Sequence, residues 1–558
     1  MNLAVRSCFW FTIALSAGVL GRPVPSRGQE PMPDPAPLQP VQAPSPNAGP
    51  NDACPPVAEQ PEEKQPPSVW DKVPPLPPPP RVGYFTIPPS GPGFYSLLDQ
   101  LRGRDRPDPP KVPYPPTASH PNSFYDADYK FLDDPKNRSG LDPFNRLKRI
   151  HLGENWMFSA GGEERVRYMD ENGGYARLTG QANVYELIRT RVYGDLWFRD
   201  RFRVYVEMQD SRIANNDLPP LPNDVDHADF LNLFADLKLL DVAGGPVYVR
   251  GGRQELYFGS QRLISPSDFP NVRRTFQGVR GFWRSEDWDI DAFWVQPVLM
   301  RPTQLDPPDH NQDFAGVWAT HRPHPGQSVD LYYLFLHNAN PVATGQGGIR
   351  GGLDLNTFGA RYAGDLDKRW LWDFEGMTQF GNYSNQQAVA GSITTGLGYR
   401  FVDVPTVPQF WLYWDRASGD PHPGSGGTHR TFNQLFPWGH TYFGYLDLVG
   451  RKNINDISVQ AVCYPARWVT AQAQFHVFRL VSARDALYNA GGVPIRVDPT
   501  GRAGTDVGQE LDLTANFHVG THQDVFVGFS HLFAGSFIRR SGPPVSPSLF
   551  YFQYSLKF

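Results

Sequence analysis

The chain has 558 residues, a formal net charge of −5 and a mean hydropathy of −0.45. This mild charge gives no sign of a general nucleic-acid-binding protein, and three widely spaced cysteines indicate neither a disulfide framework nor a metal cluster. The polar average does not exclude a membrane β-barrel, whose lumen, loops and turns are all polar. The aromatic content of 13% suits strands and the aromatic girdles at membrane interfaces.

The N-terminal residues 1–21 have the pattern of a secretory signal peptide. Arg6 gives a short positive region, an apolar stretch runs from Cys8 to Leu20, and Gly21 is one of several small residues near a possible cleavage point. Nothing later in the chain approaches the ~20 apolar residues of a transmembrane helix. We therefore expect an exported protein that contacts membranes only through strands.

Residues 22–149 are rich in proline, and more than half of the 57 prolines precede residue 125. Proline cannot donate a ladder hydrogen bond, and the segment has few apolar runs from which to build a core. We interpret it as a disordered or polyproline-like periplasmic linker. The sharper alternative is an arm that binds a periplasmic or cell-wall partner.

Residues 150–558 are predicted to form an all-β domain, a transmembrane antiparallel β-barrel of about 18 strands. In residues 202–209, for example, apolar side chains alternate with polar ones, and a tight turn at 199–201 connects them to a similar preceding segment. The expected strands are 156–168, 188–198, 202–209, 231–238, 247–257, 276–284, 288–296, 314–319, 329–336, 358–362, 370–380, 393–401, 410–414, 454–463, 469–478, 511–517, 525–532 and 550–558.

The last predicted strand has a lipid-facing pattern. Phe550, Phe552 and Phe558 fall on one face, and Tyr551 and Gln553 fall on the other. An apolar edge strand invites aggregation in water, whereas a closed barrel in the bacterial outer membrane pairs that edge and buries the apolar face in lipid. The long polar stretches 210–227, 302–312, 338–353, 416–440 and 482–508 are candidate outer loops, either simply exposed or folded inward to constrict a pore.

Arginines in or beside the predicted strands are the main functional candidates. An arginine facing lipid at mid-bilayer costs ~2–4 kcal/mol, so these side chains should face the lumen or lie near a strand end. There they either pair with carboxylates on neighbouring strands or form cationic sites that select anions. For any single arginine, pairing with a carboxylate is the favoured interpretation. For the set as a whole, cationic sites that select anions are favoured. The set is Arg165, Arg167, Arg189, Arg191, Arg203, Arg250, Arg253, Arg262, Arg273, Arg274 and Arg280.

A combination of short segments resembles the alginate export family of outer-membrane porins. The segments are VRGGRQEL at 249–256, QRLI at 261–264, NVRRTFQGVR at 271–280, ASGD at 417–420, FNQLFP at 432–437, DLVGR at 447–451 and GQELDL at 508–513. The resemblance covers about 150–558 and implies an 18-stranded barrel with an electropositive lumen that passes an anionic uronate polymer. Through the Gly-Arg-Gln match, Arg253 and Arg250 resemble the family's pore arginines, and Arg262, Arg274 and Arg280 are further candidates.

We therefore expect a passive outer-membrane channel for anionic polysaccharide or oligosaccharide, with Arg189, Arg191 and Arg203 joining the pore-lining set. Its partners would be that solute and outer-membrane lipid, with no cofactor and no nucleic acid. The alternatives are a barrel enzyme that modifies lipid or glycan, and a structural barrel that tethers the envelope. Enzyme motifs are missing from the sequence. His321 and His324 read as loop residues, and Asp289 and Asp291 as salt-bridge partners in the wall.

Overall fold

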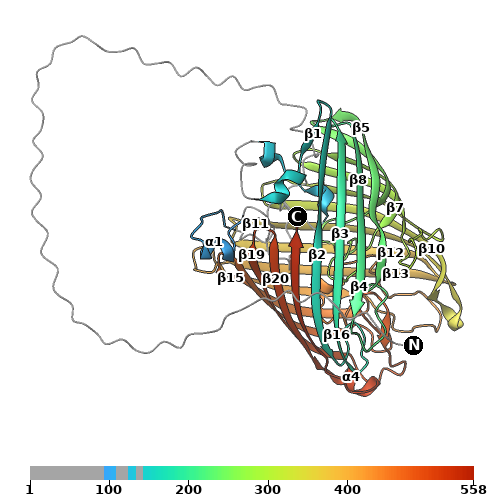
Figure 1. The fold of residues 1–558 in the computed structure, drawn as a ribbon. Helices are drawn as coiled ribbons and strands as arrows, with labels where there is room; N and C mark the ends of the chain where they lie inside the picture. Colours follow the sequence, from blue (N-terminus) through green and yellow to red (C-terminus); the bar gives the residue numbers. More distant parts are fainter. Residues whose placement is uncertain (1–93, 109–122, 128, 134–141) are drawn as a thin grey trace, which may run out of the picture. The chain divides into compact units, whose positions relative to one another are not determined.

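The computed structural model describes residues 94–108, 123–127, 129–133 and 142–558. Its main feature is one antiparallel sheet of 19 strands, in which the short β1 (Ile150–Leu152) pairs only with β2. The other 18 strands close into a barrel (Figure 1). The all-β, 18-strand prediction is confirmed. The predicted signal peptide at 1–21 and most of the proline-rich stretch lie outside the described residues.

The wall strands are mostly longer than the sequence pattern predicts. They are β2 (Trp156–Asn172), β3 (Ala182–Phe198), β4 (Phe202–Ala214), β5 (Asp226–Val242), β6 (Gly245–Gln254), β7 (Phe276–Arg284), β8 (Trp288–Pro297), β9 (Gln312–His321), β10 (Gln327–Thr344), β11 (Arg350–Leu366), β12 (Trp370–Tyr383), β13 (Gln386–Arg400), β14 (Gln409–Ala417), β15 (Ile454–Ala466), β16 (Val469–Leu480), β19 (Asp506–Gly520), β20 (Gln523–Ala534) and β21 (Ser548–Lys557). The alternation of apolar and polar residues predicts only the central part of each strand, whereas the hydrogen-bonded pairing continues beyond that part.

The remaining elements are short. They are α1 (Leu97–Leu101), η2 (Phe124–Asp126), η3 (Lys130–Asp133), η4 (Pro143–Leu147), η5 (Gln346–Gly348), α3 (Gly439–Tyr442), α4 (Ser536–Ser541) and a two-stranded sheet of β17 (Leu487–Tyr488) and β18 (Pro494–Arg496). Among the described residues, no helix combines the length and the apolar character needed to cross a membrane.

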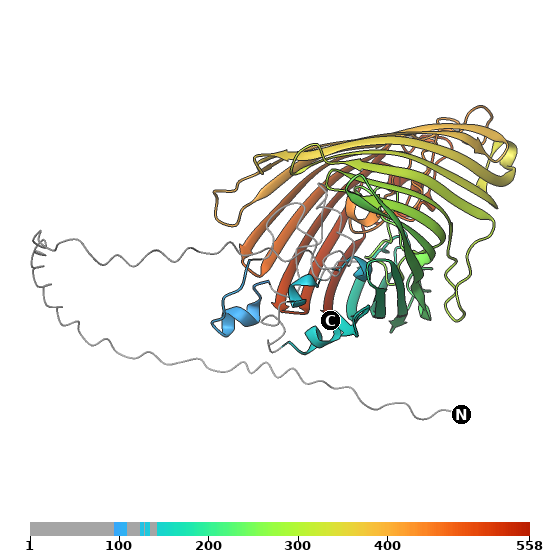
Figure 2. The same cartoon turned by 90° about the horizontal axis from the view of Figure 1, so that it is seen from above.

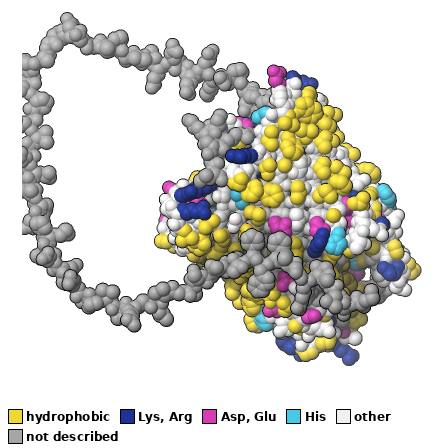
Figure 3. All heavy atoms as spheres, in the orientation of Figure 1, with side chains coloured by type: hydrophobic (Ala, Val, Ile, Leu, Met, Phe, Trp, Pro, Cys, Tyr) yellow, Lys and Arg dark blue, Asp and Glu magenta, His cyan; other side chains and the backbone are white. Residues whose placement is uncertain are grey.

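Burial alternates along the wall as the sequence predicts. On β14, Trp411 and Tyr413 are buried whereas Leu412 is 54% exposed. In β21, Phe550 and Phe552 face outward and Tyr551 is buried. Hydrophobic side chains dominate much of the barrel surface visible in Figure 3. One face of each strand therefore suits hydrocarbon, and the other holds the polar and charged residues.

The barrel closes between its last and first long strands. β21 pairs with β2 in an antiparallel register that matches Lys557 with Glu163 and Ser548 with Asn172. The backbone of Phe558 continues this seam, because it exchanges hydrogen bonds with Gly162 in both directions, at 2.9 and 3.0 Å. The closure leaves no unpaired edge in the wall, which a strand structure in lipid requires.

The two ends of the barrel differ in their connections. At the end where the chain terminates, the connections are short, as in the predicted turn at 199–201 between β3 and β4. At the other end the connections 255–275, 418–453 and 481–505 are long. Short turns at the periplasmic end and longer loops outside are typical of outer-membrane barrels.

Two long connections turn into the barrel. Leu256 and Ile264 are buried in the connection 255–275, and every residue from 437 to 451 is buried in the connection 418–453. The two loops meet where the Phe436 amide donates to the Leu263 carbonyl at 2.9 Å. The expectation that some loops fold inward is confirmed for the predicted loop 416–440, where residues 437–440 are buried. The structure extends this connection to 453, and the inward turn of 255–275 was not anticipated.

Part of the segment predicted as a disordered linker is ordered. Phe124, Tyr125 and Tyr129 are buried against the wall, where Phe124 packs on Tyr193 with ring centroids 5.3 Å apart. Figures 1 and 2 show these short helices near the end of the barrel where the C-terminus lies. The prediction is wrong for 123–127, 129–133 and 142–149, because closely spaced aromatic rings supply the apolar surface that the surrounding proline-rich sequence lacks.

An arginine placed on the outer face should destabilise the barrel more, the closer it lies to the middle of the bilayer. Val192 is 53% exposed and lies near the middle of β3. We expect Val192→Arg to lower the free energy of unfolding by ~2–4 kcal/mol, because the guanidinium enters hydrocarbon. Leu240→Arg is the matched control, 50% exposed and close to the end of β5, with an expected cost of ~0–1 kcal/mol. Denaturant titration in lipid vesicles measures both, and equal costs would contradict the outward placement of Val192.

Candidate functional site: the arginines of the lumen

The eight arginines expected from the sequence to line the pore fall into two structural classes. Arg189, Arg191, Arg203, Arg250, Arg253 and Arg280 lie on the wall strands β3, β4, β6 and β7, whereas Arg262 and Arg274 lie on the inturned connection 255–275. Six of the eight are buried, and Arg253 and Arg274 are partly exposed. The burial of these six agrees with the cost of placing guanidinium in lipid.

Most wall arginines form ion pairs with carboxylates on adjacent strands. The pairs are Arg189–Glu163 at 2.8 Å, Arg191–Glu207 at 2.7 Å, Arg203–Asp195 at 2.7 Å, Arg250–Asp236 at 2.7 Å and Arg280–Asp291 at 2.7 Å. Asp289, the other predicted wall partner, pairs with Arg322 at 2.8 Å. For these residues the wall-pairing interpretation is confirmed. Each pair neutralises a charge that burial would otherwise make costly.

Arg253 does not lie beside Arg250. In the sheet register it is matched with Leu233 and Gln277, both of which are exposed. Its guanidinium reaches the Asp229 carboxylate at 3.1 Å and also donates to a backbone carbonyl of the β8–β9 connection. The Gly-Arg-Gln motif therefore places its two arginines in different surroundings, although the resemblance treats them as one set.

The backbone conformation just before Arg253 depends on a glycine. Gly252 has a φ of +127°, and a Cβ there would lie 2.3 Å from the Leu233 carbonyl oxygen. Both observations exclude other residues at this position without a backbone shift. Gly252 thus sets how β6 ends and where the connection 255–275 enters the lumen.

Arg262 lies far from the other candidates, on the opposite wall. It pairs with Asp373 at 2.7 Å and with Glu375 at 2.8 Å, both on β12. Asp373 also receives a hydrogen bond from Arg361 at 2.7 Å. The connection 255–275 therefore crosses the lumen and is fixed to β12 by a buried charge cluster.

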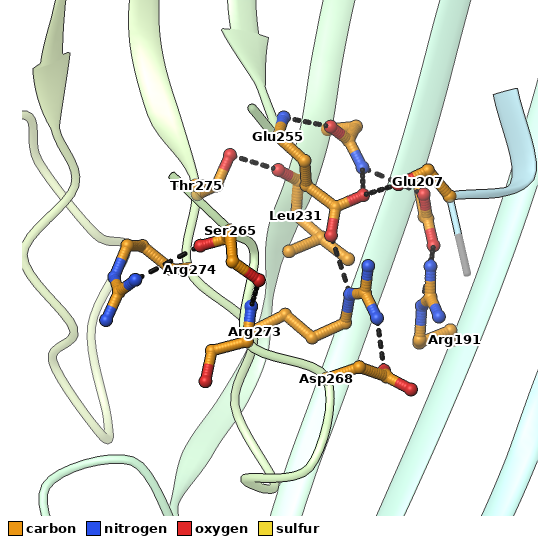
Figure 4. Close-up of polar contacts among 12 residues, drawn as sticks. Arg191, Glu207, Leu231, Glu255, Ser265, Asp268, Arg273, Arg274 and Thr275 are labelled. Carbon is orange, nitrogen blue, oxygen red and sulfur yellow. Dashed lines mark hydrogen bonds and ion pairs between the residues drawn. The ribbon is translucent and has the colours of Figure 1, made fainter. Parts of the chain in front are cut away.

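Figure 4 shows the polar network where this connection returns to the wall. Glu255 accepts hydrogen bonds from Arg273 at 2.6 Å and from Asn232 at 3.1 Å. Asn232 also donates to Glu207 at 2.9 Å, and Glu207 accepts from Arg191 at 2.8 Å. Two arginines and two glutamates are thus bridged by one amide, which keeps the two carboxylates from meeting without a donor between them.

Asp268 is the carboxylate at the centre of the arginine cluster. Burial on its own raises the pKa of this carboxyl, but Arg189, Arg273 and Arg165 lower it well below its usual range. Arg189 is 2.9 Å from it, and Arg273 also contacts it directly. The group is therefore ionised at neutral pH and holds the loop among several guanidinium groups.

Arg165 and Arg167 on β2 bind the same loop through uncharged acceptors. Arg165 donates to the backbone carbonyl of Asp268 at 2.9 Å. Arg167 donates to the carbonyl of Phe269 at 2.6 Å and to the Gln553 side chain at 2.9 Å, with its guanidinium 3.9 Å above the Phe269 ring. Their positive charges are therefore solvated by amides and a ring rather than by facing carboxylates.

Arg274 differs from the paired arginines. It donates to the carbonyls of Ser265 and Pro437, at 3.1 and 3.3 Å, and lies 5.6 Å from the Phe436 ring centroid. Burial lowers the pKa of its guanidinium to about 10, so it stays protonated at neutral pH. Together with Arg273 it lines a cavity of about 140 Å³ between the two inturned loops and β5. This cavity has room for water or part of a solute beside the charge.

The same cavity also carries acidic groups. Asp226 and Asp306 line it opposite the arginines. Burial raises the pKa of the Asp306 carboxyl to about 6, and the negative charge of Asp229 adds to the shift. The net charge of the cavity therefore depends on pH in the range just below neutrality.

The lumen wall beyond β14 is acidic. Asp456, Glu510 and Asp512 are buried there beside His476, which lies 2.8 Å from Asp456. Backbone amides of the connection 418–453 donate to these acids, with Leu446 N at 2.9 Å from Glu510. The interior thus has an arginine-rich sector along β2–β7 and an acidic sector along β15–β19. Within the described ranges, no three His, Cys, Asp or Glu side chains are grouped to hold a metal ion.

The candidate list drawn from the sequence omitted Arg361 and Arg451. Arg361 pairs with Asp330 at 3.5 Å, and Arg451 with Asp415 at 2.8 Å. Arg451 stood within the DLVGR segment at 447–451 and was not singled out. Arg361 is isolated among neutral lumen-facing positions, so strand alternation was the only available signal.

Removing the shared carboxylate of the β12 cluster should destabilise the barrel strongly. Asp373→Asn leaves Arg262 and Arg361 without their common partner, and breaking such a buried pair costs about 3–5 kcal/mol. The control is Asp403→Asn, which removes an exposed partner of Arg369 and should leave stability unchanged. Unfolding free energies in detergent micelles compare them, and equal stability of the two variants would contradict a structural role for the cluster.

Comparison with known proteins gives one matching family and several similar solved structures. The family model described as "Alginate export" matches residues 157–552. Similar solved structures include OpdQ of Pseudomonas aeruginosa (12% identity, TM-score 0.49), covering 72% of this chain and 98% of that one. OprD from Pseudomonas aeruginosa (10%, TM-score 0.46, 72% and 93%) and OccAB2 of Acinetobacter baumannii (8%, TM-score 0.47, 72% and 98%) are also similar. A search of curated proteins finds no match.

The family match spans most of the chain and nearly the whole barrel. The barrel itself has the closed wall and the apolar exterior that an outer-membrane position requires. The chain is an outer-membrane β-barrel channel that belongs to the alginate export family.

Proposed function

We propose that this channel passes anionic polysaccharide or oligosaccharide of the alginate type by passive diffusion, along the arginine-rich sector of its lumen. The observation that carries the proposal is the set of arginines around the connection 255–275. Arg165, Arg167 and Arg274 bind amide and carbonyl oxygens, so the positive charge of this sector is not balanced pair by pair. An excess of one sign focuses counter-ions into a low-dielectric cleft.

Arginine suits this solute class for a geometric reason. A guanidinium can bind a uronate carboxylate through two parallel N–H groups, and its weak hydration makes exchange easy. Conduction needs sites that attract the solute and also release it. Arg274 meets that need best, because it lines an open cavity and has no carboxylate among its hydrogen-bond partners in the described residues.

Neutralising Arg274 should weaken anion selectivity. In Arg274→Gln, the reversal potential in a salt gradient is expected to move toward that of a non-selective pore. Block by an oligouronate should weaken roughly tenfold, the loss expected for one charged hydrogen bond. Arg369→Gln is the control, because this exposed arginine lies at a turn outside the lumen. Planar-bilayer recordings measure both quantities, and unchanged values in Arg274→Gln would remove it from the solute path.

Anion selectivity should also rise as pH falls from about 7 to 5. The pKa of Asp306 is raised to about 6, so its carboxylate becomes neutral in this interval and leaves the cavity of Arg273 and Arg274 more positive. At pH 7, Asp306→Asn should already be more selective than the wild type, and its selectivity should rise less between pH 7 and 5, because Asp226 remains in the cavity. Reversal potentials across this pH range decide the matter, and an unaltered pH dependence in the variant would exclude Asp306 as its source.

A further inference from the structure

The described residues 123–127 and 129–133 belong to a short segment that occupies the space where the proposed solute path enters the arginine-rich sector. We propose that it is a built-in plug, and that an anionic solute opens the channel by competing with the plug for the same arginines. The occlusion itself does not depend on the proposed solute. Only the competition rests on the proposed function.

Aromatic rings hold the plug against the lumen wall. The guanidinium of Arg191 lies 4.3 Å from the Phe124 ring centroid, and that of Arg250 lies 4.9 Å from the Tyr125 ring. Tyr125 also packs edge-on against Phe234 of β5, with centroids 5.4 Å apart. Two arginines singled out as pore-lining are thus covered by side chains of the chain's own N-terminal segment.

Hydrogen bonds complete this contact at the level of the inturned loop. Ser123 and Tyr125 both bond Glu255, through its carboxylate at 3.2 Å and its carbonyl at 3.1 Å. Arg203 donates to the backbone carbonyl of Tyr125 at 2.8 Å. Because Glu255 directly follows the last residue of β6, the plug reaches the point where the connection 255–275 enters the lumen.

Asp126 gives the plug its resemblance to an anionic solute. Its carboxyl group accepts a hydrogen bond from Tyr257. Burial raises the pKa of this carboxyl, and the charges of Arg250, Arg280 and Arg203 oppose that shift without cancelling it. The plug therefore adds one further carboxyl group beside three arginines that already pair with wall carboxylates, Arg250 with Asp236, Arg280 with Asp291 and Arg203 with Asp195. A solute bearing carboxylates offers these arginines the same chemistry.

The residues on either side of the plug bind at the mouth of the barrel. On the C-terminal side, Asp142 lies 2.7 Å from His522, and Lys148 donates to the Tyr193 hydroxyl at 2.8 Å. On the N-terminal side, Trp468 donates to Gln100 at 2.5 Å in the turn between β15 and β16. These contacts lie apart from the arginines and do not use them. The plug can therefore leave the arginines while its flanks remain attached.

Loss of the plug's rings should open the channel. We expect the double variant Phe124→Ala/Tyr125→Ala to conduct several-fold more than the wild type in single-channel recordings of the full chain. The control is Tyr95→Ala, which removes an aromatic side chain that contacts Arg467 outside the lumen. A double variant with wild-type conductance would overturn the plug. Reversal potentials from the same traces test the proposed anion preference separately.

Thiol labelling tests the plug without removing its rings. Ala127→Cys, with the three natural cysteines replaced by serine, should react slowly with a charged thiol reagent, because Ala127 is 7% exposed. Arg102→Cys, on the exposed end of α1, is the fast control. Labelling of residue 127 as fast as the control in the absence of solute would overturn the plug.

The same labelled variant tests the competition. An oligouronate should accelerate labelling at residue 127 several-fold, and a neutral oligosaccharide of equal length should not. Equal acceleration by the neutral sugar, or none by the oligouronate, would overturn competition for the arginines. Neither result would affect the occlusion, which slow labelling of residue 127 and the conductance of the double variant test separately.

Discussion

Hydrocarbon accepts neither an unpaired backbone group nor an unsolvated guanidinium, and the architecture of this protein follows from that constraint. The first exclusion forces the 18 strands into a closed ring, with β21 joined to β2. The second directs charged wall residues to the inner surface. The alternation of burial along β14 and β21 expresses both requirements in single strands.

Once the charges are inside, the lumen must satisfy them. Wall strands alone provide pairs such as Arg250 with Asp236, but the inturned connection 255–275 supplies what remains. Asp268 enters a group of arginines at one end of this loop, and Arg262 joins two acids of β12 at the other. The loop that narrows the passage is therefore also the element that stabilises its charged walls. Constriction and stability are coupled in this barrel.

Strand alternation was enough to predict the fold class, the number of strands and the inward direction of most arginines, because all three follow from local sequence. The ordered pieces before residue 150 could not be predicted in the same way. Phe124 and Tyr125 stand in a proline-rich context, and their partners Tyr193 and Phe234 lie much later in the chain. The average composition of the segment predicts disorder, and it does not reveal that a few aromatic residues in it can pack against the barrel.

The site was less accessible to sequence reasoning than the fold. Whether the charge of an arginine is neutralised depends on residues that the fold brings close to it. Arg262 and Asp373, for example, are 111 residues apart in the sequence. Arg253 shows the same limit, because a motif match singled it out, whereas its surroundings depend on the residues that the neighbouring strands place beside it. Arg274 and Arg273 are sequence neighbours with opposite environments, one bound by carbonyls and the other by two carboxylates.

The contact between Lys148 and the chain terminus has a consequence for biogenesis. The ammonium group donates to the Phe558 carbonyl at 3.2 Å and to the Ala160 carbonyl at 2.5 Å, beside the seam where the last strand meets the first. This three-way junction exists only after the final strand has docked. The last attachment of the segment that precedes the wall therefore waits for barrel closure, so completion of the cylinder and formation of this junction are a single event.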